Sequence, residues 1–312
     1  MESAQAASHV IALRPAAFRM NSETRATNPF QGGTGAAPRT PAELQRRALE
    51  EFDAMVDALK RCHIRLTVLQ DSPDSIRPDA IFPNNWFSTH RDGTLVLYPM
   101  SVPSRRRERR PELIEAIQAL ARTKRVLDLT HFEKQNLFLE GTGSMVLDRA
   151  HRILYAALSP RTQRKPLDAF ATELNYDVEV FHALDHTGGP LYHTNIMLSI
   201  GHDAAVICAD AIPDRKERTR ILDRLSQDGS RAVHKISFAH MRAFAGNILH
   251  VLDDTGKARW LASARAARAL RAATKGILSI APVPDDIRLE TIETYGGGSL
   301  RCMLAEIFPS PE

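Results

Sequence analysis

The sequence predicts a mixed α/β fold that is assembled from repeated units of strands and a helix. Segments with the apolar spacing of amphipathic helices recur five times along the 312 residues, at intervals of roughly 50 to 63 residues. Each lies among short segments that alternate apolar and polar residues, as half-buried strands of a mixed sheet do. Because the residues themselves do not repeat visibly, this periodicity alone leaves a plain α/β sandwich open as the alternative.

The strongest helix start is Thr40-Pro41-Ala42-Glu43, where Thr at the N-cap, Pro at the first position and Glu at the third predict a capping box. The apolar residues that then recur at helical spacing are Leu44, Ala48, Phe52, Met55, Val56 and Leu59. Further helical segments begin near Ser104, Arg164, Pro213 and Ser263. Pro111 lies within the segment near Ser104, so the first turns of that helix are uncertain.

Short strands are expected between the helices. They are Ile64 to Leu69, Thr94 to Tyr98, Arg125 to Leu129, Ser144 to Leu147, Arg152 to Ala157, Asp177 to Phe181, Asn195 to Ile200, Ala204 to Cys208, Asn247 to Leu252 and Arg301 to Phe308. The segment Ser22 to Ala37 contains Gln31-Gly32-Gly33-Thr34-Gly35 and reads as a mobile loop. Whether that loop is a lid over a site is left open.

Composition narrows the class of protein. An apolar content of 43% suffices for a sizeable core, and no linker divides the chain, so a single domain over residues 1–312 is expected. The net charge of +4 does not suggest nucleic-acid binding. Three cysteines without a C-x-x-C pair form neither a disulfide framework nor a zinc-finger pattern. A cytoplasmic setting is expected, since the start is unlike a signal peptide and the apolar runs are too short to span a membrane.

Four segments carry residues suited to chemistry. Gly296-Gly297-Gly298 precedes Cys302, which opens an apolar strand in this interpretation; glycines allow close approach of backbone to a ligand. His193 follows a Gly-Pro loop at the mouth of a strand, and Glu140 is followed by Gly141-Thr142-Gly143. The fourth segment runs from Asp79 through the paired amides Asn84 and Asn85 to Trp86-Phe87.

Each of these features also has an ordinary structural explanation. Free cysteines such as Cys302 are often buried for packing, and His193 is one of twelve histidines. Glu140 is compatible with a carboxylate flanking a turn, and Asn84-Asn85 is compatible with an Asn-rich turn.

Taken together and in this order, the four segments resemble the guanidine-modifying (pentein) superfamily, which includes arginine deiminase, dimethylarginine hydrolase, agmatine deiminase and the amidinotransferases. The family pattern is an Asp-containing strand end, then Glu-Gly-Gly, then His, then a C-terminal Cys, and the matching stretches run from Arg14 to Phe308. The resemblance implies a pentein α/β propeller of five ββαβ-type modules with pseudo-fivefold symmetry, in agreement with the five helical segments.

The resemblance also implies roles for individual residues. Cys302 is the implied nucleophile, His193 the general acid and base, and Glu140 the carboxylate that faces the substrate nitrogens. Asp79 matches a residue that holds the α-amino group of the substrate. The implied partners of its α-carboxylate are Arg161 and either Arg105 or Arg106, because Arg binds carboxylates with two hydrogen bonds. The run Arg105 to Arg110 is equally compatible with a solvated helix start.

The sequence departs from the arginine-cleaving relatives at two positions. Asn85 stands where they carry Asp, and Asn195 stands where the His motif of arginine deiminases carries Asp. A guanidinium is a cation with donors only, which carboxylates suit, whereas a ureido group is neutral and has a carbonyl acceptor that an amide suits. A carboxylate facing that oxygen would be a buried, unpaired charge. The chain therefore resembles the citrulline hydrolase (citrulline ureidase) branch of the superfamily.

The expected reaction is hydrolysis of citrulline to ornithine, carbon dioxide and ammonia through a covalent intermediate on Cys302. No cofactor and no metal are expected, and the expected partner is a small amino-acid substrate, with no nucleic acid and no membrane. Homo-oligomerisation is left open. Three alternatives stand: a deiminase, dimethylarginine hydrolase or amidinotransferase acting on a guanidine; a non-catalytic pentein that only binds; and a metallohydrolase, for which no H-E-x-x-H spacing is present.

Overall fold

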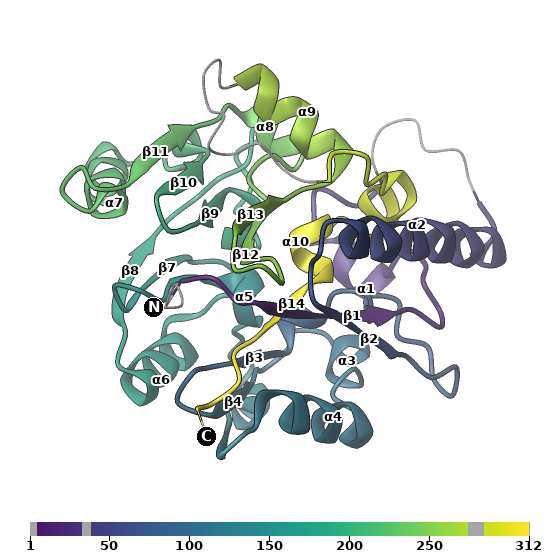
Figure 1. The fold of residues 1–312 in the computed structure, drawn as a ribbon. Coiled ribbons are helices and arrows are strands. Elements are labelled where there is room, and N and C mark those ends of the chain that lie inside the picture. The colour runs from purple at the N-terminus through teal and green to yellow at the C-terminus, as the bar shows by residue number, and fades with distance from the viewer. Residues whose placement is uncertain (1–4, 33–38, 274–283, 312) are drawn as a thin grey trace.

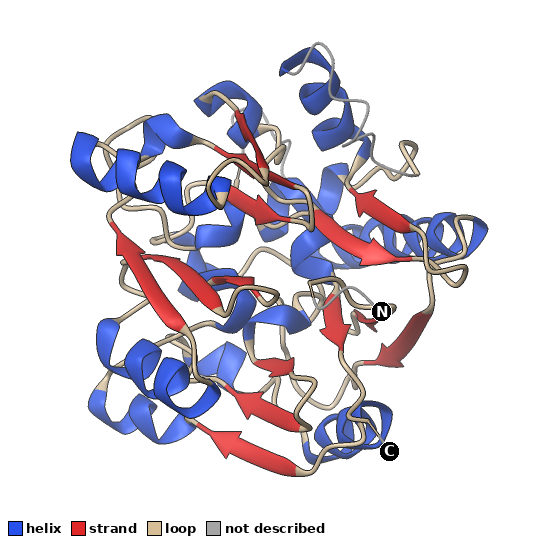
Figure 2. Ribbon diagram, turned by 60° about the vertical axis from the view of Figure 1, so that its left-hand side comes forward, coloured by secondary structure: helices blue, strands red, loops and turns tan. Residues whose placement is uncertain are grey.

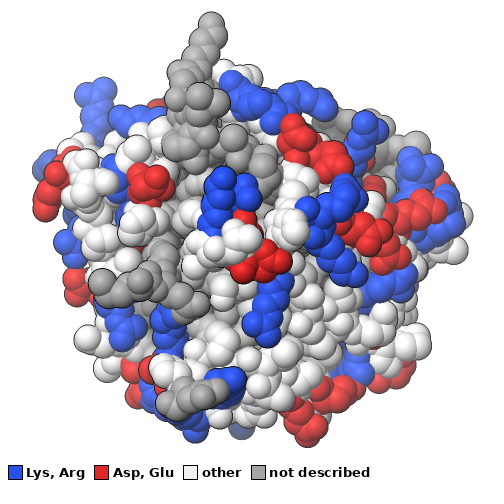
Figure 3. Space-filling model, viewed as in Figure 1, with Lys and Arg blue, Asp and Glu red and all other residues white. Residues whose placement is uncertain are grey.

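The computed structural model describes residues 5–32, 39–273 and 284–311. It has the predicted mixed α/β architecture, with five small sheets in the described residues. The longer helices lie at the outside of the molecule, and the strands lie between them and the centre (Figures 1 and 2). On the face shown in Figure 3, basic and acidic side chains are interspersed. No helix of the described part is long and apolar enough to cross a membrane.

The strands fall into groups that follow the chain. The first sheet contains β14 (Ala305–Ile307), β1 (His9–Arg14) and β2 (Leu66–Gln70), and the second contains β3 (Phe87–Thr89), β4 (Thr94–Leu97) and β5 (Arg125–Asp128). The third contains β6 (Val146–Asp148), β7 (Ile153–Ala157) and β8 (Asp177–Phe181), and the fourth contains β9 (Leu198–Ile200), β10 (Ala204–Ile207) and β11 (Ala232–Lys235). The fifth contains β12 (Leu249–Leu252) and β13 (Ala258–Leu261).

The same topology recurs from sheet to sheet. In each three-stranded sheet the middle strand pairs antiparallel with one neighbour and parallel with the other. A parallel pair needs a crossover, and here a helix supplies it. The crossover helices are α2 (Pro41–Arg61), α4 (Pro111–Ala121), α6 (Arg164–Leu174) and α7 (Arg215–Ser226), and α9 (Ala264–Ala273) follows the fifth sheet. The repeat interpretation is therefore confirmed over the alternative of a plain sandwich.

The first and last described strands close the ring of sheets. In the first sheet β1 pairs antiparallel with β14, with His9 opposite Ile307, and parallel with β2. The strand β1 was not predicted from the sequence, and neither were the short strands β3, β11 and β13.

Helix α2 shows how local sequence and packing agree. The side chain of Thr40 accepts a hydrogen bond from the backbone N–H of Glu43, as predicted. The Glu43 half of the predicted capping box is not formed, because the carboxylate of Glu43 bonds to Arg39 and Arg47 instead. The six apolar residues predicted to share one face are all buried. The helical segment expected near Ser104 is two helices, α3 (Pro103–Arg106) and α4, because Pro111 begins the second at a position where no N–H is needed.

Short helical turns come directly before one edge strand of several sheets, called the inner strand: β3, β6, β9 and β14. They are the 3-10 turn Pro83–Asn85 before β3, α5 (Gly141–Ser144) before β6, the 3-10 turn Thr194–Ile196 before β9, and α10 (Leu300–Met303) before β14. The strands expected to begin at Ser144, Asn195 and Arg301 therefore begin later, and Cys302 lies on α10 rather than opening a strand. In α10 the backbone N–H groups of Cys302 and Met303 both donate to the Ser299 carbonyl, which favours the turn over extended backbone.

The remaining short elements are α1 (Ser22–Arg25), α8 (Phe238–Arg242), the 3-10 turns Thr130–Gln135 and Ala209–Ala211, and a π-helical turn at Ile292–Gly296.

Candidate active site

The predicted site residues gather where these inner turns meet. A small cavity there is lined by Thr24, Asn28, Asp79, Phe82, Asn85, Arg105, Arg161, Tyr192, His193, Gly296, Gly297, Gly298 and Cys302. Six of the eight residues named from the sequence are among them, and Glu140 and Asn195 lie directly behind, bonded to His193 and Cys302 respectively. Arg106, the alternative to Arg105, instead donates to the backbone carbonyls of Met100 and Ser101.

Cys302 is buried and receives hydrogen bonds from two amides. Nδ2 of Asn247 lies 3.3 Å from its Sγ, and Nδ2 of Asn195 lies 3.6 Å away. Burial raises the pKa of the Cys302 thiol, although the hydrogen bond from Asn247 and the charge of Arg301 lower it. The resting side chain is therefore a neutral thiol, with N–H donors already directed at the atom that becomes negative.

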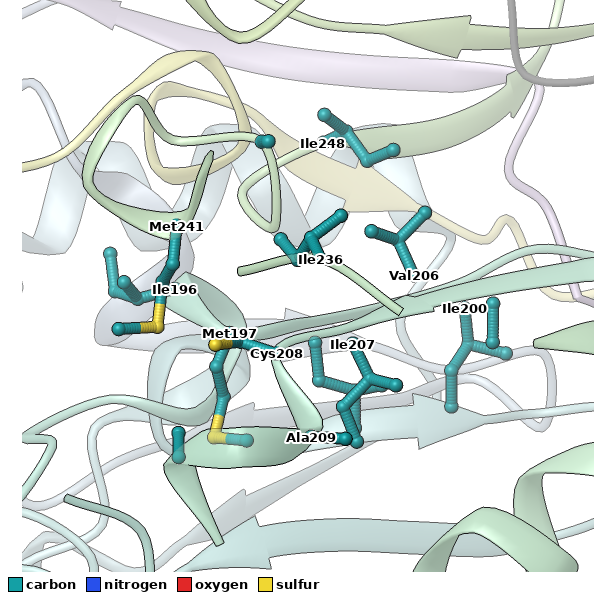
Figure 4. Close-up of a cluster of buried hydrophobic side chains, with 14 of the residues drawn as sticks. Ile196, Met197, Ile200, Val206, Ile207, Cys208, Ala209, Ile236, Met241 and Ile248 are labelled. Carbon is teal, nitrogen blue, oxygen red and sulfur yellow. The ribbon is translucent and has the colours of Figure 1, made fainter. Parts of the chain in front are cut away.

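The other two cysteines have different surroundings. Cys208 is buried in an aliphatic cluster with Met197, Ile207 and Ile236 (Figure 4), and burial raises the pKa of its thiol to about 11. Cys62 is the half-buried C-cap residue of α2. Neither lines the cavity, so Cys302 is the cysteine placed to act on a ligand there.

His193 and Glu140 form a buried pair. Nε2 of His193 and Oε2 of Glu140 are 2.8 Å apart. Burial lowers the pKa of His193 to about 4, although Glu140 raises it. Burial alone would raise the pKa of Glu140, but Arg161 and the hydrogen bond from His193 outweigh it and hold the carboxylate ionised. His193 is therefore a neutral imidazole whose Nε2–H donates to Glu140, which leaves Nδ1 as an acceptor.

Both oxygens of Glu140 are bonded to protein groups. Oε1 accepts from the backbone N–H of Ser101 at 3.0 Å and from its hydroxyl at 2.8 Å. Oε2 is shared by His193 and by Nη1 of Arg161, which lies 3.5 Å away. The structure thus places Glu140 behind His193, where it orients the ring, rather than among the residues that line the cavity.

Asp79 presents an unpaired oxygen at the cavity. Its Oδ2 accepts from Nδ2 of Asn21 at 2.8 Å and from Oγ1 of Thr24 at 3.3 Å, whereas Oδ1 is buried without a partner within the described residues. Burial raises the pKa of Asp79, although Arg105 lowers it. An unpaired buried carboxylate oxygen is costly, so this atom is suited to accept from a cationic donor on a ligand.

Arg105 and Asn85 are joined by a short hydrogen bond. Nη1 of Arg105 donates to Oδ1 of Asn85 at 2.6 Å. The rest of the guanidinium forms a two-bond pair with Glu108, with Nε to Oε1 and Nη2 to Oε2 both at 2.9 Å. All three side chains are buried. The expectation of a solvated helix start is wrong for Arg105, because these contacts fold its side chain inward.

Gly143 explains part of the glycine pattern after Glu140. A Cβ atom at this position would lie 2.4 Å from Nδ2 of Asn85 and 2.8 Å from Nδ1 of His193. No side chain fits there, so the glycine allows both nitrogen atoms to approach the same point.

The segment Asn21–Gly32, the cover segment, lies over the cavity and contributes Thr24 and Asn28 to its lining. Asn28 donates to the Gly297 carbonyl at 3.4 Å, and Gln31 donates to the Gly296 carbonyl at 3.3 Å. Gly297 has φ +69°, and a Cβ there would lie 2.5 Å from Nδ2 of Asn28. The cover segment is thus folded onto the glycine run. Residues 33–37, which complete the predicted mobile loop, lie outside the described residues.

Sequence reasoning missed Asn247, which is buried and donates to both Cys302 Sγ and the Asn195 carbonyl. A signal for it is present in the sequence. Asn85-Trp86-Phe87, Asn195-Ile196-Met197, Asn247-Ile248-Leu249 and Cys302-Met303-Leu304 all have a polar residue followed by two apolar ones, just before the inner strand of a sheet. Asn247 is the member that belongs to the fifth sheet.

Comparison with known proteins decides the family. The sequence profile described as N,N dimethylarginine dimethylhydrolase, eukaryotic, matches residues 14–309. The chain belongs to this family. It is therefore a hydrolase of the guanidine-modifying superfamily, and the expected pentein fold is confirmed. No curated protein matched the sequence.

Solved structures of this superfamily share the fold. The N-terminal domain of ArgZ, an arginine dihydrolase of cyanobacteria, was captured with a covalently bound reaction intermediate; it is 16% identical, with a TM-score of 0.69 over 97% of this chain and 98% of that one. Unliganded AgrE is 18% identical, with a TM-score of 0.72 over 97% of this chain and 40% of that one. A dimethylarginine dimethylaminohydrolase carrying a S-methyl-L-thiocitrulline adduct is 18% identical, with a TM-score of 0.63 over 96% of this chain and 100% of that one.

Within the described residues, no group of three or more His, Cys, Asp or Glu side chains is placed to hold a metal ion. The hypothesis of a metallohydrolase thus has no ligand set in this part of the chain.

Proposed function

We propose that the protein hydrolyses the ureido group of citrulline, giving ornithine, carbon dioxide and ammonia, with Cys302 as the nucleophile. The observation that carries the proposal is the chemistry around Cys302 and His193. Three of the side chains that offer hydrogen bonds beside Cys302 or His193 are neutral amides, those of Asn85, Asn195 and Asn247. Among the residues that line the cavity, the carboxylate is Asp79, and the oxygens of Glu140 are already bonded.

A guanidinium in this position would place a buried cation against amide donors, whereas a ureido group is neutral and its oxygen accepts from N–H. Oδ1 of Asn195 is buried without a partner among the described residues and belongs to the amide that bonds Cys302, so we assign it as an acceptor for a ureido N–H group. Amides therefore fit the proposed substrate better than they fit arginine or dimethylarginine.

The reaction begins from a neutral thiol and a neutral imidazole. Nδ1 of His193 takes the Cys302 proton as Sγ attacks the ureido carbon, and the negative charge passes to the ureido oxygen. The imidazolium then protonates the side-chain nitrogen of the departing ornithine, which leaves a thiocarbamoyl group on Cys302. Water, deprotonated by the same His193, adds to that group and expels the thiolate, which regains a proton from the imidazolium. The resulting carbamate decomposes to carbon dioxide and ammonia, so one citrulline and one water are consumed per turnover.

In this mechanism Glu140 acts on His193. Its ionised carboxylate holds the ring in one tautomer and stabilises the imidazolium that forms twice per turnover. We assign the α-amino group of the substrate to Oδ1 of Asp79 and its α-carboxylate to the side of the cavity formed by Arg161.

The test is an incubation of the purified protein with citrulline, arginine, dimethylarginine and agmatine, followed by measurement of ammonia and of the amino-acid products. Ornithine formed from citrulline is the expected result. Citrulline formed from arginine or dimethylarginine, with citrulline itself left intact, would assign the protein to guanidine hydrolysis, which the family description favours.

A further inference from the structure

We infer that Arg105 is a positioning residue that fixes the orientation of the Asn85 amide, so that an N–H donor rather than the carbonyl is presented to the reacting group of the substrate. The inference rests on the proposed function and names the residue that sets its preference for a ureido over a guanidine group. It gives Arg105 a different task from the carboxylate binding that the family resemblance implies.

The chemistry of arginine settles which way the amide points. A guanidinium carries donors only, so the amide atom 2.6 Å from Nη1 of Arg105 must be the oxygen. Asn84 supports the same orientation, because its Oδ1 accepts from Nδ2 of Asn85 at 3.1 Å. Oxygen and nitrogen of a side-chain amide are otherwise hard to tell apart, but here the partner allows one assignment.

Arg105 is itself held by contacts that leave it little freedom. Besides the two-bond pair with Glu108, its Nη2 donates to the Phe82 carbonyl at 3.0 Å. The side chains of Arg105 and Glu108 are 3% and 0% exposed, so the pair is not loosened by water. A guanidinium fixed in this way is a rigid support for the Asn85 oxygen.

The other end of the amide lies beside the proton-transfer atom. Nδ2 of Asn85 and Nδ1 of His193 both approach the space above Gly143 that a Cβ would fill. One N–H of Asn85 bonds to Asn84, and the second has no hydrogen-bond partner among the described residues. That second N–H can donate to the ureido oxygen, and this hydrogen bond strengthens as the oxygen becomes negative. An N–H of arginine in the same place would put two hydrogen-bond donors against each other.

Two variants test the inference, both prepared with Cys302→Ser so that ligands bind without turnover. Arg105→Lys keeps the charge but has a single donor group for both Glu108 and Asn85. Arg105→Gln combined with Glu108→Gln removes both charges together, so no buried charge is left unpaired if the first variant fails to fold. Calorimetric affinities are measured for citrulline, arginine and ornithine, the last of which has the same α-amino-acid end without a ureido group.

With Arg105 intact, citrulline binds more tightly than arginine. Both variants reduce this preference at least about tenfold, because the amide is free to turn its carbonyl inward, while the affinity for ornithine changes less than about twofold. An unchanged preference would overturn the inference, and ornithine binding that weakens in step with citrulline would return Arg105 to the α-carboxylate. Tighter binding of arginine than of citrulline when Arg105 is intact would instead refute the proposed function.

Discussion

Nε2 of His193 lies 2.8 Å from Oε2 of Glu140, and both side chains are buried. The carboxylate fixes which ring nitrogen carries the proton, and burial keeps the ring neutral. Nδ1 of His193 is left as an acceptor, and in the proposed mechanism it takes the proton of Cys302. For a neutral substrate this is required, because citrulline brings no positive charge that could favour the thiolate.

The first prediction concerns pH. Because burial lowers the pKa of His193 to about 4, the neutral ring persists where an ordinary histidine, with a pKa of about 6.5, is already protonated. We expect kcat/KM for citrulline to stay within about twofold from pH 7.5 down to about pH 5.5, and to fall as pH drops through the pKa of His193. Circular dichroism at each pH controls for unfolding. An acid limb centred near pH 6.5 would contradict the prediction.

The second prediction separates the three cysteines. Cys302→Ser should abolish turnover, since a hydroxyl in this place is a far poorer nucleophile. Cys62→Ser and Cys208→Ala should retain it; alanine is chosen for Cys208 because its surroundings are aliphatic. Iodoacetamide should inactivate the wild-type protein with label on Cys302. Label confined to Cys62 in an inactivated protein would argue against Cys302.

The third prediction concerns the acid and base pair. His193→Ala should lower kcat on the order of 10²- to 10⁴-fold, the usual effect of losing a positioned proton-transfer group. Glu140→Gln keeps an oxygen for the His193 N–H but loses the charge that stabilises the imidazolium, so kcat should fall while KM changes little. If Glu140 contacts the substrate instead, KM rises. Steady-state kinetics of both variants make this distinction.

The fourth prediction tests the amide at position 85. Asn85→Asp should lower citrulline hydrolysis at least about 10²-fold, the effect of losing a donor to a developing oxyanion. It should also improve the binding of arginine relative to citrulline, although Arg105 will pair with the new carboxylate and limit the gain. The double variant Asn85→Asp with Asn195→Asp should lose more citrulline hydrolysis than either single variant. Unchanged citrulline activity in Asn85→Asp would refute the ureido assignment but leave the cysteine chemistry standing.

The fifth prediction concerns the far end of the substrate. Asp79→Asn should raise KM for citrulline, because the unpaired Oδ1 loses its charge toward the α-amino group, and kcat should change less. N-carbamoyl-putrescine, which lacks the α-carboxylate, should be a poor substrate. If N-carbamoyl-putrescine is hydrolysed as well as citrulline, the assignment of Arg161 to the carboxylate is wrong.

Much of the framework could be predicted from the sequence, because α2 and most strands are specified by local patterns of apolar residues and a cap. The turns before the inner strands could not. The apolar residues that follow Ser144, Asn195 and Cys302 predict strands that begin at or just before these residues. In the structure each of the three lies in a helical turn and the strand begins after it, which we attribute to packing at the centre of the molecule.

The eight residues named from the sequence lie together at one cavity, but the side chains that they bond to could not be predicted. Asn247 is identified by a polar residue followed by two apolar ones, too short a pattern to stand out without the fold. For Arg105 the sequence allowed both a carboxylate-binding residue and part of a solvated basic run, and its pairing with Glu108, three residues on, explains why it is buried. Contacts between side chains distant in sequence, such as Asn85 with Arg105, follow from the ring of sheets and not from either segment alone.

The pairing of β1 with β14 bears on the order in which the protein matures during translation. A nascent chain can assemble the sheets of β3–β5, β6–β8 and β9–β11 as they leave the ribosome, but β1 must wait for Ala305–Ile307 before its antiparallel partner exists. Cys302 lies three residues ahead of that strand. His193 and Glu140 are thus synthesised well before Cys302, and a polypeptide interrupted ahead of Cys302 is released without the nucleophile that we propose.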